Sequence, residues 1–390
     1  MSRDNNMQIS LTGEKSHKVV IPAGQGSLSI GTKGISAGKY DVWVEKGQQI
    51  NWDAFNEFYT GAGKQNSEQY PYGDWPRFFY YSGEDSGFIA WSAYRPIETF
   101  HWLPKENATV DLTKAQIDIL AIDVCSNEIE IIIGEKLEHL SLAGYLENIT
   151  IKKCVRIPML QFTPLCSDSK SQTLRLPVYK TIEKVTHVSV GVPPIGHAFD
   201  CESLLQFPDL NDLTLSGNLT NLQALAELKH LEHIALRYVP DLTDMPNLSA
   251  WNSLISFIGW NIEETAGKAI RAELNKLSKE KDMGFTSISQ LRKKIWFTTE
   301  YGIPFSGWEN KYAKIATKAY KACLKVIKKA KAESEVHKAI VEFIESINKL
   351  PNIETTERED VATAVDQLIE SSSLEISQET GLEWFYETID

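Results

Sequence analysis

The feature that most restricts the fold of this chain is a spaced pattern of apolar residues in its middle third. The pattern places apolar side chains at the first, fourth and sixth positions of a nine-residue stretch, and asparagine or cysteine at the ninth. Residues 119–127, 146–154 and 210–218 match all four positions. Stretches that begin at Leu137, Val185, Leu231 and, more weakly, Leu254 match in part. A pattern that returns in this way predicts an internal structural repeat.

The later stretches recur at a nearly constant spacing. Their first residues lie 25, 21 and 23 residues apart, from Val185 through Leu210 and Leu231 to Leu254. Side chains of a β-strand alternate between its two faces, so the fourth and sixth positions would turn inward together. One such stretch cannot bury its own apolar face, and it gains stability only by stacking on its neighbours. We therefore expect short strands that stack into a parallel sheet.

On these residues, the segment 119–262 resembles leucine-rich-repeat proteins of the bacterial, intracellular type. The resemblance implies an α/β fold, a leucine-rich-repeat solenoid with a parallel sheet. The asparagine or cysteine of the ninth position can hydrogen-bond backbone at a turn. The stretches at Leu137 and Leu146 begin only nine residues apart, and residues 158–180 are irregular. We therefore expect a regular solenoid over residues 185–262 and a looser one before it.

The segment before the repeat, residues 1–105, is predicted to be a small β-rich domain of sandwich or barrel type. Glycines separate short apolar runs, and residues 40–44 alternate as a strand does. Eighteen aromatic residues lie between positions 40 and 102. A domain of about 100 residues cannot easily bury all of them, so they either pack in a core and on the first repeat or form an exposed patch. Trp75 and Tyr80 are our candidate binding residues in this domain.

The segment after the repeat is predicted to be a helical domain, which divides the chain into residues 1–105, 106–262 and 263–390. Apolar residues recur there at spacings of three and four, and capping-box motifs begin at Ser287 and Thr356. We expect four or five helices in a bundle. Residues 311–331 carry eight lysines and no acidic residue, whereas residues 354–390 carry eleven acidic residues and one base. The lysines either contact an anionic partner or form a solvated helix face apposed to the acidic tail.

Composition restricts the class of partner. The 390-residue chain has a formal net charge of −12, which disfavours nucleic acid and anionic membranes as partners and attracts a basic protein. It contains no uncharged apolar run long enough to span a membrane, and its first residues are polar, so we predict a cytoplasmic protein without a secretory signal. The five cysteines are widely spaced, which predicts reduced thiols rather than disulfides.

The motifs that carry catalysis are incomplete in this sequence. The glycine-rich run 24–34 has Lys33 out of the order that a phosphate loop requires, so it predicts β-turns. His230 and His233 straddle the start of a repeat strand and have no companion ligand motif. Cys323 lies among lysines but on the apolar side of its predicted helix. We therefore predict no catalytic residue, no metal site and no cofactor.

The expected fold predicts a non-enzymatic protein-binding scaffold. Side chains that alternate with the inward leucines would be exposed on the sheet and available to a partner. The candidate contacts are Asp123, Ser141, Thr150, Ser189, Thr214, Ala235 and Arg237. By its architecture the chain looks like an immunity protein or a regulator that binds and neutralises a partner protein, such as a basic toxin.

Two alternatives use the aromatic-rich N-terminal segment. The first is a hydrolase or a transferase in which Asp74, Glu84 or Asp85 acts as acid or base, since paired carboxylates can do such work. The second is a glycan-binding protein, in which exposed tryptophan and tyrosine rings stack on a sugar.

Overall fold

The computed structural model of this chain describes residues 7–10, 18–21, 27–57, 78–166, 173–299, 304–351, 353–374 and 376–389. The chain divides into two compact units. Unit 1 comprises Met1–Ile35 and Asp41–Thr299, and unit 2 comprises Ser36–Tyr40 and Glu300–Asp390.

A large parallel sheet forms the main layer of unit 1. Its strands lie in the order β19-β18-β17-β15-β13-β12-β10-β8-β6-β5-β3-β4, and each pair of neighbours is parallel. The strands are β3 (Ser27–Thr32), β4 (Val42–Val44), β5 (Phe78–Gly83), β6 (Ile97–Pro104), β8 (Ile117–Val124), β10 (His139–Gly144), β12 (Met159–Pro164), β13 (His187–Gly191), β15 (Asp212–Ser216), β17 (His233–Arg237), β18 (Ser256–Trp260) and β19 (Phe285–Ser289). The predicted α/β class with a parallel sheet is confirmed.

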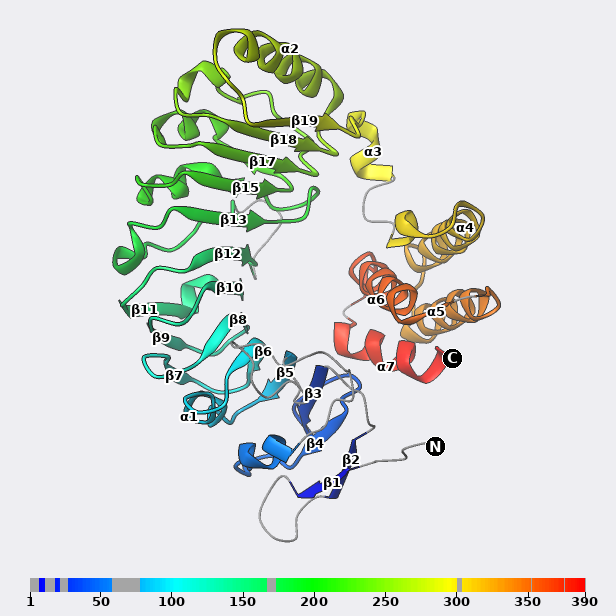
Figure 1. Cartoon of the computed structure of the whole chain (residues 1–390). Coiled ribbons are helices and arrows are strands. Elements are labelled where there is room, and N and C mark those ends of the chain that lie inside the picture. The colour runs from blue at the N-terminus through cyan, green and yellow to red at the C-terminus, as the bar shows by residue number, and fades with distance from the viewer. Residues whose placement is uncertain are drawn as a thin grey trace, which may run out of the picture. The chain divides into compact units, whose positions relative to one another are not determined.

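A second layer covers one face of this sheet. Figure 1 shows unit 1 as an arc, with the large sheet along its inner side and the second layer along its outer side. The outer layer consists of the parallel strands β7 (Ala108–Asp111), β9 (Ile129–Ile133) and β11 (Ile149–Cys154), the strand pair β14 (Phe199–Asp200) and β16 (Leu219–Thr220), the short 3-10 helices η2 (Leu146–Asn148), η3 (Lys180–Ile182), η4 (Cys201–Gln206), η5 (Leu222–Glu227) and η6 (Leu248–Ala250), and the helices α1 (Phe88–Ser92) and α2 (Glu264–Glu280). The chain therefore passes repeatedly from a sheet strand to the outer layer and back.

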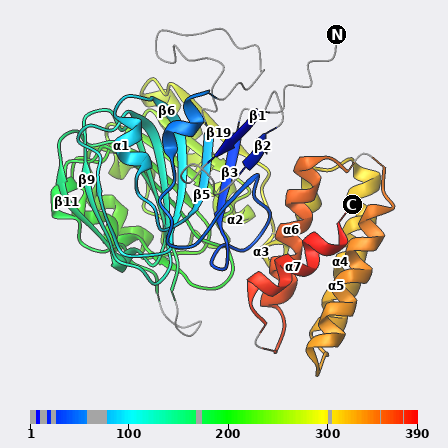
Figure 2. The same cartoon turned by 90° about the horizontal axis from the view of Figure 1, so that it is seen from below.

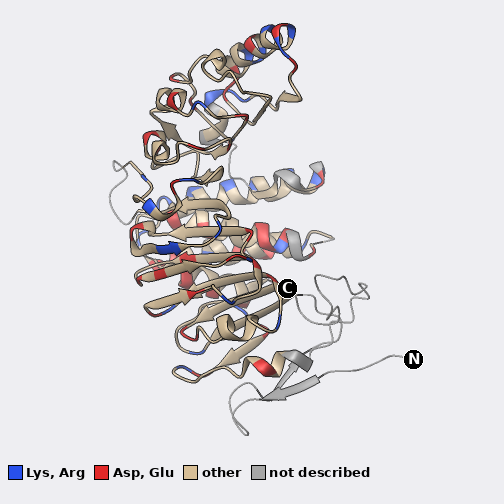
Figure 3. Ribbon diagram, turned by 60° about the vertical axis from the view of Figure 1, so that its left-hand side comes forward, with Lys and Arg blue, Asp and Glu red and all other residues tan. Residues whose placement is uncertain are grey.

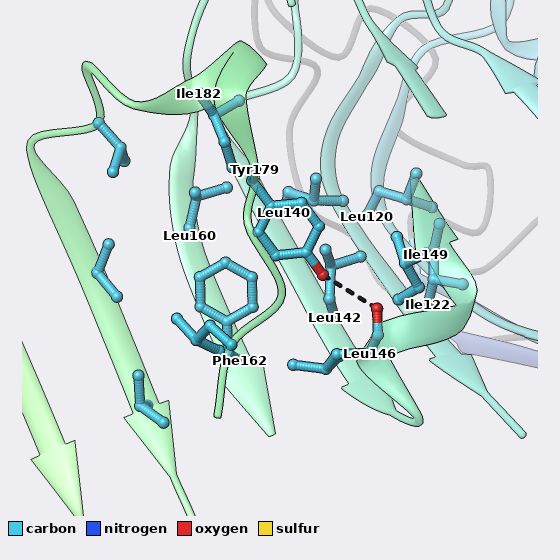
Figure 4. Close-up of a cluster of buried hydrophobic side chains, with 14 of the residues drawn as sticks. Leu120, Ile122, Leu140, Leu142, Leu146, Ile149, Leu160, Phe162, Tyr179 and Ile182 are labelled. Carbon is cyan, nitrogen blue, oxygen red and sulfur yellow. Dashed lines mark hydrogen bonds between the residues drawn. The ribbon is translucent and has the colours of Figure 1, made fainter. Parts of the chain in front are cut away.

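The core of unit 1 lies between these two layers. The fourth and sixth positions of the sequence pattern supply it, because they are inward neighbours on every matched strand. Leu140, at a fourth position, is the Cα partner of Leu120 on β8 and of Leu160 on β12, which lie outside these positions, and all three are buried. Figure 4 shows them with Tyr179, whose hydroxyl donates a hydrogen bond of 3.2 Å to the carbonyl oxygen of Leu146. The leucine pattern thus marks the buried face of the sheet.

The stretch 146–154 lies in the outer layer rather than in the large sheet. Its first residues form η2, and its apolar residues Ile149 and Ile151 lie on β11, which pairs with β9. Here the chain carries one strand in each layer: the stretch that begins at Leu137 lies on β10, and the stretch that begins nine residues later at Leu146 lies on β11. Thr150 therefore projects from the outer layer and not from the large sheet.

The aromatic-rich segment continues the same sheet. Phe79 and Phe100 are Cα partners on β5 and β6, and Phe100 pairs in turn with Leu120 of β8. Aromatic side chains thus take the inward positions that leucines take further along, where a separate sandwich or barrel was expected. The expected domain boundaries at residues 105 and 262 both fall inside unit 1.

Four further elements complete unit 1. They are the antiparallel strands β1 (Met7–Ser10) and β2 (Lys18–Ile21), the 3-10 helix η1 (Trp52–Glu57), and the helix α3 (Lys294–Thr299).

Unit 2 is a helical bundle, shown in Figure 2. It contains η7 (Pro304–Gly307), α4 (Asn310–Ile327), α5 (Glu333–Asn348), α6 (Thr355–Glu370) and α7 (Gln378–Thr388). Phe305, Tyr320, Phe343 and Val365 are among the buried residues of a core of its own. Within the described residues, no helix combines the length and the apolar character needed to cross a membrane.

Candidate binding face of the large sheet

One face of the large sheet is not packed against the core, and we call it the open face. Its middle line, the central row, consists of one residue from each strand from β3 to β19 in the sheet order, without β4, and the members are Cα partners across the sheet. The central row is Ser29, Tyr80, His101, Ala121, Ser141, Gln161, Ser189, Thr214, Ala235, Ile258 and Ser287. Each member is exposed or half-buried, while its neighbours along most of these strands are buried. Alternation along parallel strands therefore builds the row directly from the sequence.

The central row contains no aspartate, glutamate, lysine or arginine. The charged residues in the twelve strands of the large sheet are Glu98, Asp118, Asp123, Asp212 and Arg237. Figure 3 shows blue and red segments mostly in the helices and connecting segments. The two aromatic members of the central row, Tyr80 and His101, stack with ring centroids 4.7 Å apart, and Tyr80 is 44% exposed. Burial lowers the pKa of His101, so its ring is neutral at pH 7. The row is thus a neutral polar surface with an aromatic pair toward one end.

A second row follows the carboxyl ends of the strands. Asp123 pairs with Ala143, and Ser216 pairs with Arg237, which pairs with Trp260. Shielding from water raises the pKa of Asp123, although Lys105 opposes the shift and the residue as a whole remains exposed. Trp260 meets Tyr238 edge to face at 4.9 Å, beside the exposed Arg237. This row therefore adds one acid, one base and a second aromatic pair, at separate places on the sheet.

A third row follows the amino ends of the strands and is rich in histidine. His139 pairs with Met159, and Asp212 pairs with both His187 and His233. Together with His101, this face holds four of the eight histidines of the chain. Burial lowers the pKa of His139. Among the residues that the structure describes, no group of three or more His, Cys, Asp or Glu side chains is placed to hold a metal ion.

The structure brings most of the candidate contacts together. Ser141, Ser189, Thr214 and Ala235 lie in the central row, as does Tyr80. The second row contains Asp123 and Arg237. Thr150 is exposed on the outer layer, away from the open face, because β11 pairs with β9. Trp75 lies outside the described residues.

Several residues of the open face were not expected from the sequence. Gln161 was missed because it lies in the stretch that looked irregular, although Leu160 and Phe162 on either side of it alternate as inward residues do. Trp260 was missed because Gly259 weakens the last stretch of the pattern. His101 was missed because its inward neighbours are aromatic rather than leucine.

The carboxylates of the hydrolase alternative hold loop backbone in place. Asp85 accepts hydrogen bonds from the backbone N–H groups of Ile50, at 2.5 Å, and of Gly87, at 2.6 Å. Glu84 accepts one from the N–H of Gly47 at 3.3 Å. Asp74 lies outside the described residues. These contacts give Glu84 and Asp85 a structural role.

The aromatic rings of the glycan-binding alternative are largely internal. Most of the described rings between residues 52 and 102 are buried, namely Trp52, Phe55, Phe79, Tyr81, Phe88, Trp91, Phe100 and Trp102. Trp52 contacts five of the others at centroid distances of 5.5 to 5.9 Å. These rings form a core, and Tyr80 and Tyr94 are the large exposed ones among those described.

Cys323 is a buried thiol of unit 2. Its Sγ atom donates a hydrogen bond of 3.2 Å to the carbonyl oxygen of Ala339. Burial raises its pKa to about 12, so the thiolate needed for nucleophilic attack is scarce at neutral pH.

The open face is therefore the strongest candidate for function. Comparison of the chain with protein families, with curated proteins and with solved structures gives no match.

Proposed function

We propose that this chain is a leucine-rich-repeat scaffold whose open face binds a protein partner. The observation that carries the proposal is the central row, which crosses the sheet in unbroken register from Ser29 to Ser287. With parallel strands about 4.8 Å apart, this row is on the order of 48 Å long. Small ligands bind in concave sites where a few polar groups converge, whereas these polar groups are spread along a line.

The composition of the open face supports a protein partner. The centres of protein interfaces are depleted of charge and enriched in aromatic residues. The central row is uncharged at pH 7, and Tyr80 and Trp260 stand toward the two ends of the sheet. Strand side chains are already ordered before binding, which lowers the entropic cost of association.

A ladder of asparagine side chains supports the leucine-rich-repeat assignment. The amides of Asn127, Asn148 and Asn218 donate hydrogen bonds of 2.9 to 3.0 Å to carbonyl oxygens 22 or 23 residues earlier in the chain. Asn127 and Asn218 occupy the ninth position of the pattern, where such a bond was expected. We call one strand of the large sheet, with the outer-layer segment that follows it, a coil. Each bond connects one coil to the coil before it, as the repeat requires.

Charge narrows the partner. The net charge of −12 attracts a basic protein over long range and speeds the encounter. An immunity protein that neutralises a basic toxin, or a regulator of a basic protein, matches these properties.

The test is capture of the partner with matched surface variants. Ser189→Arg with Thr214→Arg places two bulky charges in the central row, and Thr150→Arg places the same side chain on the outer layer. We expect the double variant to lose the captured protein while Thr150→Arg retains it. The captured protein is then identified and its affinity measured with purified components, where we expect a loss of at least about tenfold. Equal binding by all three proteins, with circular dichroism spectra unchanged, rejects the open face as the site.

A further inference from the structure

Helix α4 of unit 2 carries a concentration of positive charge in an acidic chain. Residues 311–331 contain eight lysines, all of them exposed, and no acidic residue. Lys311 lies 5.7 Å from the centre of the Tyr312 ring. Among the described residues, no carboxylate lies within ion-pair distance of these lysines. The acidic helices of the same unit therefore leave this charge unpaired.

The helix also has two apolar seams, of which one is used inside unit 2. The inner seam is Ala316, Tyr320, Cys323 and Ile327, and all four residues are buried. It packs in the bundle, where α4 contacts α5 and α6.

The second seam, which we call the open seam, consists of Ile315, Ala319, Ala322 and Val326. Its spacing of four, three and four residues is the same as that of the inner seam. Ile315 is 42% exposed and Val326 is 51% exposed, so the largest side chains of the open seam face solvent. Such a seam is the surface that a coiled-coil partner contacts.

The lysines occupy regular heptad positions relative to the open seam. When Ile315 and Ala322 are heptad d positions, the g positions are Lys311, Lys318 and Lys325. The c positions are then Lys314, Lys321 and Lys328. Residues at g border the seam and pair with charges of the partner helix, whereas residues at c lie farther around the helix. Three lysines are thus placed where acidic side chains of a docked helix would meet them.

We propose that α4 binds an acidic amphipathic helix of a partner protein along the open seam. The apolar side chains of that helix would cover Ile315 and Val326, and its carboxylates would pair with Lys311, Lys318 and Lys325. This is the helix-in-groove mode of recognition. The surface lies on unit 2 and does not depend on binding at the open face of the sheet.

Other occupants fit the surface less well. In an antiparallel pair of α4 helices the lysines at g would face one another, and in a parallel pair they would face the e positions, Ala316 and Cys323, which are already buried in the bundle, so neither arrangement favours self-pairing. A nucleic acid would pair with the lysines but would leave the apolar seam without a role, and the net charge of −12 opposes its approach. A partner helix uses both the charge and the seam.

A synthetic peptide of defined pattern tests the proposal on the full-length protein. The probe has three heptads with leucine at a and d and glutamate at e and g, and the control peptide has the same composition with leucines distributed around the helix. Fluorescence anisotropy of the labelled peptides measures their affinity. We expect the patterned peptide to bind at least about tenfold more tightly than the control peptide. Equal affinities overturn the proposal.

Two matched pairs of lysines then locate the contact. Lys318→Glu with Lys325→Glu reverses charges beside the open seam, and Lys314→Glu with Lys321→Glu makes the same charge change at c positions. We expect the first pair to weaken peptide binding at least about tenfold and the second pair only a few-fold. Equal loss in both variants overturns the proposal and indicates a contact that senses charge alone.

The apolar part of the contact has its own variant and readouts. Ile315→Ser with Val326→Ser changes exposed positions, and circular dichroism verifies that the bundle remains folded. Ion pairs are screened at high salt, so the peptide binding that remains there depends on the apolar side chains. We expect this variant to lose that remaining binding. Tight binding of a labelled single-stranded oligonucleotide that is weakened alike by both lysine pairs contradicts the proposal. So does a wild-type oligomer, seen by sedimentation, that these serine substitutions dissociate.

Discussion

Gly217 stands where no side chain fits. Its φ is +101°, and a β-carbon at this position would lie 1.8 Å from the carbonyl oxygen of Val192. An L-residue therefore meets both an unfavourable backbone region and a collision with backbone. We expect Gly217→Ala to lower the free energy of unfolding by about 3 kcal/mol or more. Chemical denaturation monitored by circular dichroism measures this loss.

Gly196→Ala is the matched control for that prediction. Gly196 has a φ of +108°, but nothing lies within 4 Å of the position that its β-carbon would take. The alanine there encounters only the backbone cost, about 1 to 2 kcal/mol. If the two substitutions cost the same, the close approach of the Val192 carbonyl contributes nothing.

Asp366 on α6 links the stability of unit 2 to pH. Burial, and then the charge of Glu370, raises its pKa to about 6, and its Oδ1 atom is buried with no hydrogen-bond partner. A carboxyl group whose pKa is raised by folding stabilises the protein while protonated, and that stability is lost as the pH rises through about 6. We expect Asp366→Asn to be more stable than wild type near neutral pH, on the order of 1 kcal/mol after allowance for partial exposure.

The pH dependence of that difference is the decisive measurement. The gap between Asp366→Asn and wild type should narrow as the pH falls below about 6, because Asp366 then becomes protonated in the folded protein. Glu359→Gln, on an exposed position of the same helix, removes one negative charge and should show no such narrowing. A gap that is constant over the whole range contradicts the assignment.

At the scale of elements, Asp200 joins three successive coils of unit 1. It is 3% exposed, caps η4 by accepting a hydrogen bond of 3.0 Å from the N–H of Glu202, and accepts another of 2.9 Å from the amide of Asn221. Arg175 approaches the other carboxylate oxygen at 2.5 Å. We expect Asp200→Ala to lower the free energy of unfolding by about 2 to 3 kcal/mol, because it removes the cap and leaves Asn221 unpaired.

Arg175→Ala distinguishes the contribution of the ion pair to stability from that of the hydrogen bonds between coils. The Arg175 side chain is 54% exposed, and ion pairs with exposed partners contribute less than about 1 kcal/mol. The two variants are compared in the same denaturant titration. A cost for Arg175→Ala as large as that for Asp200→Ala shows that the ion pair, not the hydrogen bonds between coils, is what matters.

The sequence predicted strands where leucine, isoleucine or valine supplies both inward positions. The stretches around Leu140, Val188, Leu213 and Ile234 form β10, β13, β15 and β17, whose alternation is unmistakable. The chain near Phe79 was assigned to a different fold because aromatic rings replace leucines at the inward positions. Physically the two are equivalent, since either kind of side chain fills the space between the layers.

The end of the sheet was predicted wrongly. The motif from Ser287 to Gln290 indicated the start of a helix, whereas Phe285–Ser289 forms β19 and pairs with β18. Ser287 and Gln290 satisfy the sequence pattern of a capping box, but here β18 presents backbone groups that the segment pairs with instead.

The residues of the open face were predictable one by one from alternation, but the register between neighbouring strands was not, because it depends on turns of unequal length.

At the scale of the whole molecule, the buried residues fall into two separate hydrophobic cores. One core extends from Leu28 to Leu274 and belongs to unit 1, while the other extends from Phe305 to Phe385 and belongs to unit 2. Cooperative unfolding requires that elements share buried contacts. We therefore expect the full-length chain to unfold in two transitions, visible by calorimetry or in a denaturant titration with probes in each unit.

The residue variants assign the two transitions. Gly217→Ala should shift only the transition of unit 1, and Asp366→Asn only that of unit 2, because each residue lies in one unit. The double variant should show both shifts with their single-variant sizes, since distant sites without shared partners are additive. A single transition that both substitutions move contradicts this expectation and means that the two units unfold as one.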